Sequence, residues 1–144
     1  MCQLIMFEAK VYTTAILSLS GMMDETHIAR ETVSRFNQQH AASTGRLFLP
    51  VDDPQAADVV IGIVGNYIEK ADVIEEAVKA GKQVLLFFSK YQDPKNTIPM
   101  EGKAVETFKK EMGAKCVCCE FSGKADFEAS LAKALAVIEI NMNK

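Results

Sequence analysis

Two runs of consecutive apolar residues constrain the fold of this chain more than any other feature. They are VVIGIV at 59–64 and VLLFF at 84–88, and a helical pattern at 70–80 separates them. A strand with one face in water alternates apolar and polar side chains, whereas an uninterrupted apolar strand is buried on both faces. A strand, a helix and a second strand in this order build a parallel sheet. The two runs therefore predict the centre of a parallel sheet that helices cover on both sides.

The rest of the chain repeats the same alternation. We expect the second run to belong to a strand at 83–89, and we expect further strands at 9–16, 47–51 and 115–121. Further helices are expected at 25–40, 101–112 and 125–141. In the first of these helices Ala29, Val33 and Phe36 recur at helical spacing. No helix is expected between the second and third strands, where DDP marks a turn. Right-handed crossovers then predict five strands in the flavodoxin-like order 2-1-3-4-5, a mainly parallel, doubly wound α/β sheet.

Length and charge exclude several classes of protein. The 144 residues fit one domain at roughly 100–200 residues per domain, so we treat 1–144 as a single α/β domain. With 16 basic and 19 acidic residues, the chain lacks the basic balance typical of nucleic-acid binders. No apolar run approaches the ~20 residues of a membrane span, and the short apolar N-terminus lacks the features of a secretory signal. We therefore expect a cytoplasmic protein that binds neither nucleic acid nor membranes.

The cysteines bear on compartment and on metal chemistry. Cys2 lies near the N-terminus, and Cys116, Cys118 and Cys119 crowd into the last predicted strand. Cys116 and Cys119 have the CxxC spacing, but side chains three apart on a strand point to opposite faces. We interpret these thiols as small buried residues in a reducing compartment, with a zinc site or a redox pair as the alternative. We expect no metal site and no cofactor.

The predicted strand order also indicates where a ligand would bind. Ligands of open parallel sheets bind beyond the carboxyl ends of the strands, at the point where strand order reverses, here between the first and third strands. Small and hydroxyl-bearing residues at these ends let backbone N–H groups approach a phosphate or a ribose. The candidate ligand-binding residues are Thr13, Thr14, Ser18, Ser20, Gly21, Gly65, Asn66, Tyr67 and Ser89. The phosphate-binding signatures GxxxxGKS/T and GxGxxG are both absent from the sequence.

Acidic residues gather at the start of the helix that follows the third strand. Asp72 and Glu76 lie one turn apart there, near the mouth of the predicted crevice. A carboxylate in this place could hold a ribose hydroxyl or stabilise an oxocarbenium ion while a glycosidic bond breaks. The helix macrodipole also favours acidic residues in a first turn, and Glu75 has Lys79 four residues further on. We favour this second interpretation and keep Asp72 and Glu76 as candidate catalytic residues.

Motifs spread over residues 9–140 resemble a known superfamily. They are VYTT before a small-residue loop, an acidic helix that includes 23–33, the segment DVVIGIVG at 58–65, and Gly81-Lys82 before the apolar strand. This layout resembles the Toll/interleukin-receptor-like and nucleoside deoxyribosyltransferase-like superfamily, and most of all the bacterial TIR-like domain of unknown function. The resemblance implies the same flavodoxin-like architecture.

What the resemblance implies about activity depends on one position. Catalytic members of the superfamily carry a glutamate on the helix after the third strand, about two turns before the Gly-Lys pair. Val73 stands at that position here, with Asp72 beside it and Glu76 one turn later. We therefore expect a TIR-like domain that recognises a nucleotide, a nucleoside or a protein partner without retained catalysis, assembled as a homodimer. The alternative is an N-glycosidase or deoxyribosyltransferase that acts on a nucleoside, a nucleotide or NAD through Asp72 or Glu76.

Overall fold

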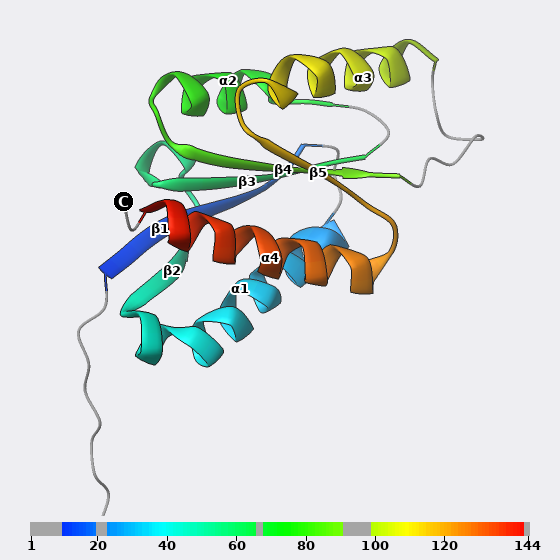
Figure 1. Cartoon of the computed structure of the whole chain (residues 1–144). Coiled ribbons are helices and arrows are strands. Elements are labelled where there is room, and N and C mark those ends of the chain that lie inside the picture. Colours follow the sequence, from blue (N-terminus) through cyan, green and yellow to red (C-terminus); the bar gives the residue numbers. More distant parts are fainter. Residues whose placement is uncertain (1–9, 20–22, 66–67, 91–98, 143–144) are drawn as a thin grey trace, which may run out of the picture.

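A five-stranded sheet lies at the centre of the computed structural model, which describes residues 10–19, 23–65, 68–90 and 99–142 (Figure 1). All four neighbouring strand pairs are parallel. The spatial order is β2-β1-β3-β4-β5, so the predicted fold class and strand order are confirmed. The strands are β1 (Lys10–Ser18), β2 (Arg46–Val51), β3 (Val59–Val64), β4 (Gln83–Ser89) and β5 (Val117–Phe121).

Within the described ranges, four α-helices cover the two faces of the sheet. Figure 1 shows two of them against each face, α1 with α4 and α2 with α3. A single 3-10 turn, η1 (Pro54–Ala56), replaces a helix between β2 and β3, as the DDP turn signal predicts. The helices are α1 (Met23–Thr44), α2 (Ala71–Lys79), α3 (Pro99–Gly113) and α4 (Lys124–Met142). No helix in the described part of the chain combines the length and the apolar character needed to cross a membrane.

The first strand and the first helix are both longer than the sequence predicts. Strand β1 continues to Ser18 because Ser18 still pairs with Ile63 of β3, and the next amide, Leu19 N–H, donates to the Ile63 carbonyl at 2.9 Å. Helix α1 continues past its predicted end at residue 40 to Thr44, and Gly45 follows it. That glycine has a φ of 71°, which ends a helix without steric strain. The extra pairing moves the carboxyl end of β1 two residues along the chain.

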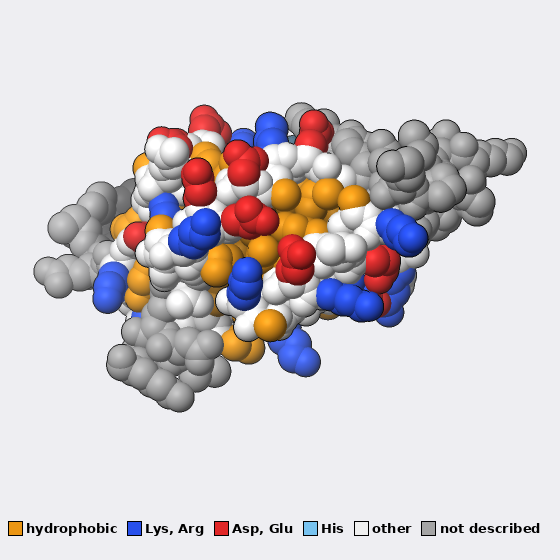
Figure 2. Space-filling model, turned by 90° about the horizontal axis from the view of Figure 1, so that it is seen from above, with side chains coloured by type: hydrophobic (Ala, Val, Ile, Leu, Met, Phe, Trp, Pro, Cys, Tyr) orange, Lys and Arg blue, Asp and Glu red, His pale blue; other side chains and the backbone are white. Residues whose placement is uncertain are grey.

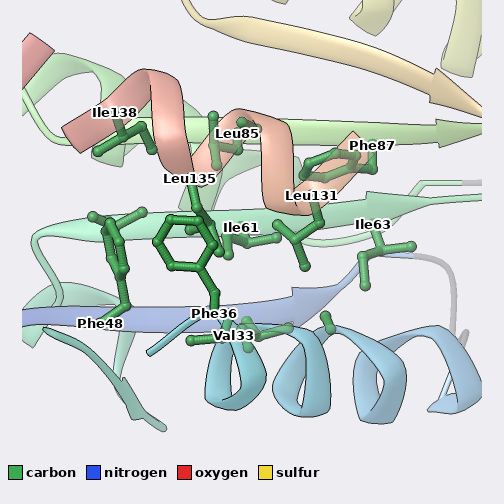
Figure 3. Close-up of a cluster of buried hydrophobic side chains, with 14 of the residues drawn as sticks. Val33, Phe36, Phe48, Ile61, Ile63, Leu85, Phe87, Leu131, Leu135 and Ile138 are labelled. Carbon is green, nitrogen blue, oxygen red and sulfur yellow. The ribbon is translucent and has the colours of Figure 1, made fainter. Parts of the chain in front are cut away.

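The larger hydrophobic cluster lies between the sheet and the pair α1 and α4. Figure 3 shows side chains from both helices and from β2, β3 and β4 meeting in this layer. The ring of Phe127 on α4 is fully buried and lies edge-on to Phe87 and Phe121, with centroid separations of 5.4 and 4.8 Å. Aromatic pairs in this arrangement contribute about 0.5–1.5 kcal/mol each beyond their burial. These contacts fix α4 on the sheet.

A second cluster packs on the opposite face, under α2 and α3. Every residue of β3 is buried, as its continuous apolar run predicts. Gly62 sits in the middle of β3, where a Cβ atom would lie 2.8 Å from the Leu86 side chain and 3.2 Å from that of Leu19. Figure 2 shows this face from outside, with charged side chains surrounding a strip of apolar ones. The close packing at Gly62 brings β3, β4 and the residue that follows β1 together.

Candidate functional site

The carboxyl ends of β1 and β3 lie side by side at the point where strand order reverses. Ser18, the last residue of β1, is in register with Ile63 of β3. The chain that leaves β3 passes back over β1, because the Glu69 N–H donates to the Leu19 carbonyl at 2.8 Å. Gly65, which directly follows β3, is buried at this edge. Ser18 and Gly65 therefore lie at the predicted crevice, and we refer to this place as the switch-point edge.

Thr13 and Thr14 do not reach the switch-point edge, contrary to the expectation from sequence. Thr14 is in register with Val59, the first residue of β3, so both threonines lie near the amino end of that strand. The Thr14 side chain is fully buried, and its hydroxyl donates to the Tyr12 carbonyl at 3.0 Å. The reason is the length of β1, which places these residues in the middle of the strand. Thr14 has a structural role.

Thr13 and Lys82 together hold the turn that leads into β3. The Thr13 hydroxyl donates to the Ala56 carbonyl at 3.0 Å and accepts from the Asp58 N–H at 3.1 Å. The Lys82 ammonium donates to the carbonyls of Pro54, Gln55 and Ala57 at 3.0, 2.5 and 2.8 Å. A lysine between a helix-ending glycine and a buried strand was the only sequence signal for this arrangement. Both side chains act at the amino edge of the sheet, away from the switch point.

Ser89 lies at the carboxyl edge as predicted, on the far side of β3 from β1. It is the last residue of β4 and lines a hollow of about 300 Å³ between α3 and the end of β5, together with Lys90, Lys109 and Glu120. The Lys109 ammonium forms an ion pair and hydrogen bond with the Glu120 carboxylate, which hold the pKa of that carboxyl below its usual range. The remaining candidates, Ser20, Gly21, Asn66 and Tyr67, lie outside the described residues.

The two candidate catalytic carboxylates do not face one common hollow. Asp72 lies exposed in the first turn of α2. Glu76 is also exposed and lines a hollow of about 370 Å³ between the second half of α2 and η1, whose other polar side chains include Asp53 and Lys82. That hollow lies at the amino edge of β3 and β4, because η1 and Lys82 directly precede these strands. Glu76 is thus directed away from the predicted crevice, and Asp72 does not line the hollow.

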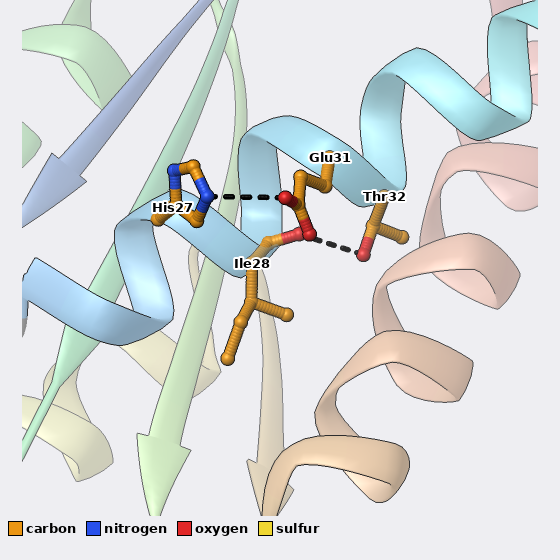
Figure 4. Close-up of polar contacts among 4 residues, drawn as sticks. All are labelled: His27, Ile28, Glu31 and Thr32. Atoms are coloured by element: carbon orange, nitrogen blue, oxygen red, sulfur yellow. Dashed lines mark hydrogen bonds and ion pairs between the residues drawn. The ribbon is translucent and has the colours of Figure 1, made fainter.

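The polar contacts of His27 and Thr32 stay within helix α1. His27 Nε2 lies 3.0 Å from a Glu31 carboxylate oxygen four residues on, and the Thr32 hydroxyl donates to the Ile28 carbonyl at 2.8 Å (Figure 4). The His27 and Glu31 side chains are 74% and 52% exposed, so water weakens their interaction. Such pairs contribute at most about 0.5 kcal/mol to a helix and do not form a buried acid–base dyad. Among the described residues there is also no group of three metal-ligating side chains.

Comparisons with known proteins find similarity in fold but not in sequence. No protein-family model matches the sequence, and no curated protein is similar to it. Among solved structures, it is similar to the translation elongation factor SelB from Methanococcus maripaludis, with a TM-score of 0.56 and 10% identity over 93% of this chain and 37% of that one. Homoserine dehydrogenase from S. aureus matches with a TM-score of 0.45 and 15% identity over 79% of this chain and 33% of the enzyme. The chain therefore spans about a third of the length of these proteins.

Proposed function

We propose that this chain is a cytoplasmic TIR-like domain that binds a nucleotide or nucleoside at the switch-point edge and does not cleave it. The observation that carries the proposal is the meeting of the β1 and β3 carboxyl ends at Ser18 and Gly65. In open parallel sheets this is the position at which ligands bind. A residue without a Cβ at the end of β3 lets a ligand come close to the backbone there.

The start of α2 supports an anionic ligand at the same edge. The residue before the helix, Lys70, has a φ of 60° and its side chain makes no capping hydrogen bond. The first N–H groups of the helix therefore receive no partner from that side chain, and the macrodipole favours negative charge there. The amide of Glu69 ties this helix start to Leu19. A phosphate bound at the end of β3 would lie near these N–H groups.

The positions of the acidic residues support binding without cleavage. Glycosidases canonically place two carboxylates on either side of the reacting sugar. Val73 occupies the position at which catalytic members of the resembled superfamily carry glutamate, and its side chain lines the hollow at the amino edge. Asp72 and Glu76 do not converge on a shared space. The two candidate carboxylates are therefore not arranged as a pair around one sugar.

The test is a thermal-shift and base-release experiment on the full chain with nucleotides, nucleosides and NAD. We expect at least one nucleotide to raise the melting temperature and no free base to appear. Ser18→Asp adds negative charge at the switch-point edge and should remove the stabilisation by nucleotide, whereas the matched change Ser34→Asp, on the exposed face of α1, should keep it. Light scattering on the same samples measures whether the expected homodimer forms.

Two outcomes would reject parts of this proposal. Base release that disappears in Asp72→Ala or Glu76→Ala would establish the N-glycosidase or deoxyribosyltransferase alternative. No stabilisation by any compound of the panel would reject the nucleotide ligand and leave recognition of a protein partner.

A further inference from the structure

Two cysteine thiols lie together on one face of the edge strand β5. Cys118 belongs to β5, and Cys116 lies two residues before it, where the strand has not yet begun. Both side chains are half-buried and pack against the cluster under α3, whereas Cys119 packs against the cluster on the other face of the sheet. The prediction that the CxxC pair points to opposite faces is therefore confirmed, and the thiols that share a face are those of the CxC pair.

Residues two apart on an extended strand share a face, and the Cys116 and Cys118 side chains pack into the same cluster as neighbours. The Cys116 S–H donates to the Met112 carbonyl of α3 at 3.4 Å. It can turn from that carbonyl to the Cys118 sulfur when Cys118 loses its proton. A sulfenic acid condenses with a neighbouring thiol to form a disulfide, so a second cysteine at this place can resolve it.

The charges around the pair distinguish the two sulfur atoms. The hydrogen bond from Cys116 lowers the pKa of Cys118, burial raises it, and the nearby Lys109 ammonium lowers it, with a net shift downward. The same hydrogen bond and burial raise the pKa of Cys116. Burial also raises the pKa of Cys119, on the opposite face. Cys118 is thus the one of the three thiols with an enhanced thiolate fraction, and the thiolate is the nucleophile.

We propose that Cys116 and Cys118 form a redox-active dithiol that reduces a hydroperoxide, a function separate from ligand binding at the switch-point edge. The Cys118 thiolate attacks the outer oxygen of the hydroperoxide and the O–O bond breaks. Cys118 becomes a sulfenic acid, and the alkoxide or hydroxide that leaves takes a proton from water. The Cys116 sulfur then attacks the sulfenic sulfur, a disulfide forms, and the Cys116 proton leaves with the hydroxyl group as water. Two thiols are oxidised while one hydroperoxide is reduced to an alcohol or to water.

The spacing of the pair predicts a disulfide that is readily reduced. Residues two apart on an ideal strand have Cα atoms about 6.6 Å apart, near the upper end of the range of roughly 4.4–6.8 Å that disulfides span. Cys116 precedes the β4–β5 ladder, which begins at Val117, so its backbone can adjust without breaking strand pairing. A strained disulfide at a sheet edge has a relatively oxidising potential and is returned to the dithiol by ordinary thiols.

The experiment uses the full chain with Cys2→Ser and Cys119→Ser, which leaves only the proposed pair. After treatment with hydrogen peroxide, intact mass should fall by two hydrogen atoms and both thiols should stop reacting with N-ethylmaleimide. Dithiothreitol should restore both. A product that forms only as a disulfide-linked dimer, or that retains two reactive thiols, would overturn the proposal.

Variants in the same background assign the two roles. Cys116→Ser should stop at the sulfenic acid of Cys118, which dimedone traps, whereas Cys118→Ser should react with peroxide at least several-fold more slowly. Adding Lys109→Met to Cys116→Ser should slow dimedone labelling several-fold, because the cation near the thiolate is lost. Cys118→Ala repeats the test if the serine variant fails to fold, and circular dichroism verifies each fold. Equal peroxide reactivity of Cys116 and Cys118 would refute the assigned roles.

Discussion

Replacement of Gly62 by alanine tests how tightly the centre of the sheet is packed. The added Cβ would lie 2.8 Å from Leu86 Cδ2, 3.2 Å from Leu19 Cδ1 and 3.4 Å from Ile74 Cδ1. Non-bonded carbon atoms prefer about 3.5–4.0 Å, so the closest contact is too short by roughly 0.7 Å. Overpacking of a core on this scale costs about 1–3 kcal/mol. For a chain of this size that lowers the melting temperature by roughly 3–10 °C.

Two other glycines supply matched controls for the steric argument. A Cβ on Gly113 would meet no atom within 4 Å, and this last residue of α3 has no positive φ, so Gly113→Ala should stabilise by about 0.4–1 kcal/mol. Gly81 also has open space but a φ of +77°, so Gly81→Ala should cost about 1–2 kcal/mol through backbone strain alone. Gly62→Ala thus tests crowding, Gly81→Ala tests backbone strain, and Gly113→Ala involves neither effect.

Calorimetry or urea unfolding of Gly62→Ala, Leu86→Val and the double variant completes the test. Shortening Leu86 removes the closest contact, so the double variant should be less destabilised than the sum of the two single changes. A Gly62→Ala chain as stable as the original, or strictly additive single changes, would refute the packing argument.

Three further changes test polar contacts, each by chemical unfolding. Asn37 donates to the Phe48 carbonyl and accepts from its N–H, which ties α1 to the edge strand β2. Asn37→Ala should therefore cost about 1–3 kcal/mol, because both backbone groups lose their partner. Lys82→Met should cost a similar ~1–3 kcal/mol and loosen the segment 54–57, seen as faster hydrogen exchange there. Burial raises the pKa of Glu139, whose Oε1 has no partner, so the folded chain binds its proton more tightly than the unfolded chain. The charged Glu139 carboxylate destabilises the folded chain fully at pH values above its raised pKa, and this effect vanishes as pH falls through 4.5. Glu139→Gln should therefore stabilise the chain by about 1 kcal/mol at neutral pH and by less in acid.

The fold could be predicted because its strongest signals are local. In the runs at 59–64 and 84–88 apolar residues follow one another without the polar positions that an amphipathic helix would show. Both runs are buried central strands in the structure. The end of β1 could not be predicted in the same way. It depends on pairing between Ser18 and Ile63, which lie 45 residues apart in the chain, and no local pattern encodes that register.

The candidate site was predicted only in outline, for the same physical reason. Fold topology places Ser18, Gly65 and Ser89 at the carboxyl edge, but Thr13 lies in the middle of β1, beside the turn that leads into β3. The hollow beside Glu76 is lined by Lys82 and by the turn that Lys82 holds, a contact across 25–28 residues that no local pattern encodes. The Cys116–Cys118 pair had a visible signal in its CxC spacing, which places alternate side chains of a strand on one face.

Binding of a nucleotide at the switch-point edge is the central claim, and an NMR titration of the isotope-labelled full chain with adenosine monophosphate tests it most directly. Backbone amide shifts should be largest at Ser18, Leu19, Gly65 and Glu69, and small at Lys82 and in the turn before β3. Shifts concentrated around Glu76 and Lys82 would place the ligand in the hollow at the amino edge and contradict the claim, as would an unchanged spectrum at saturating nucleotide.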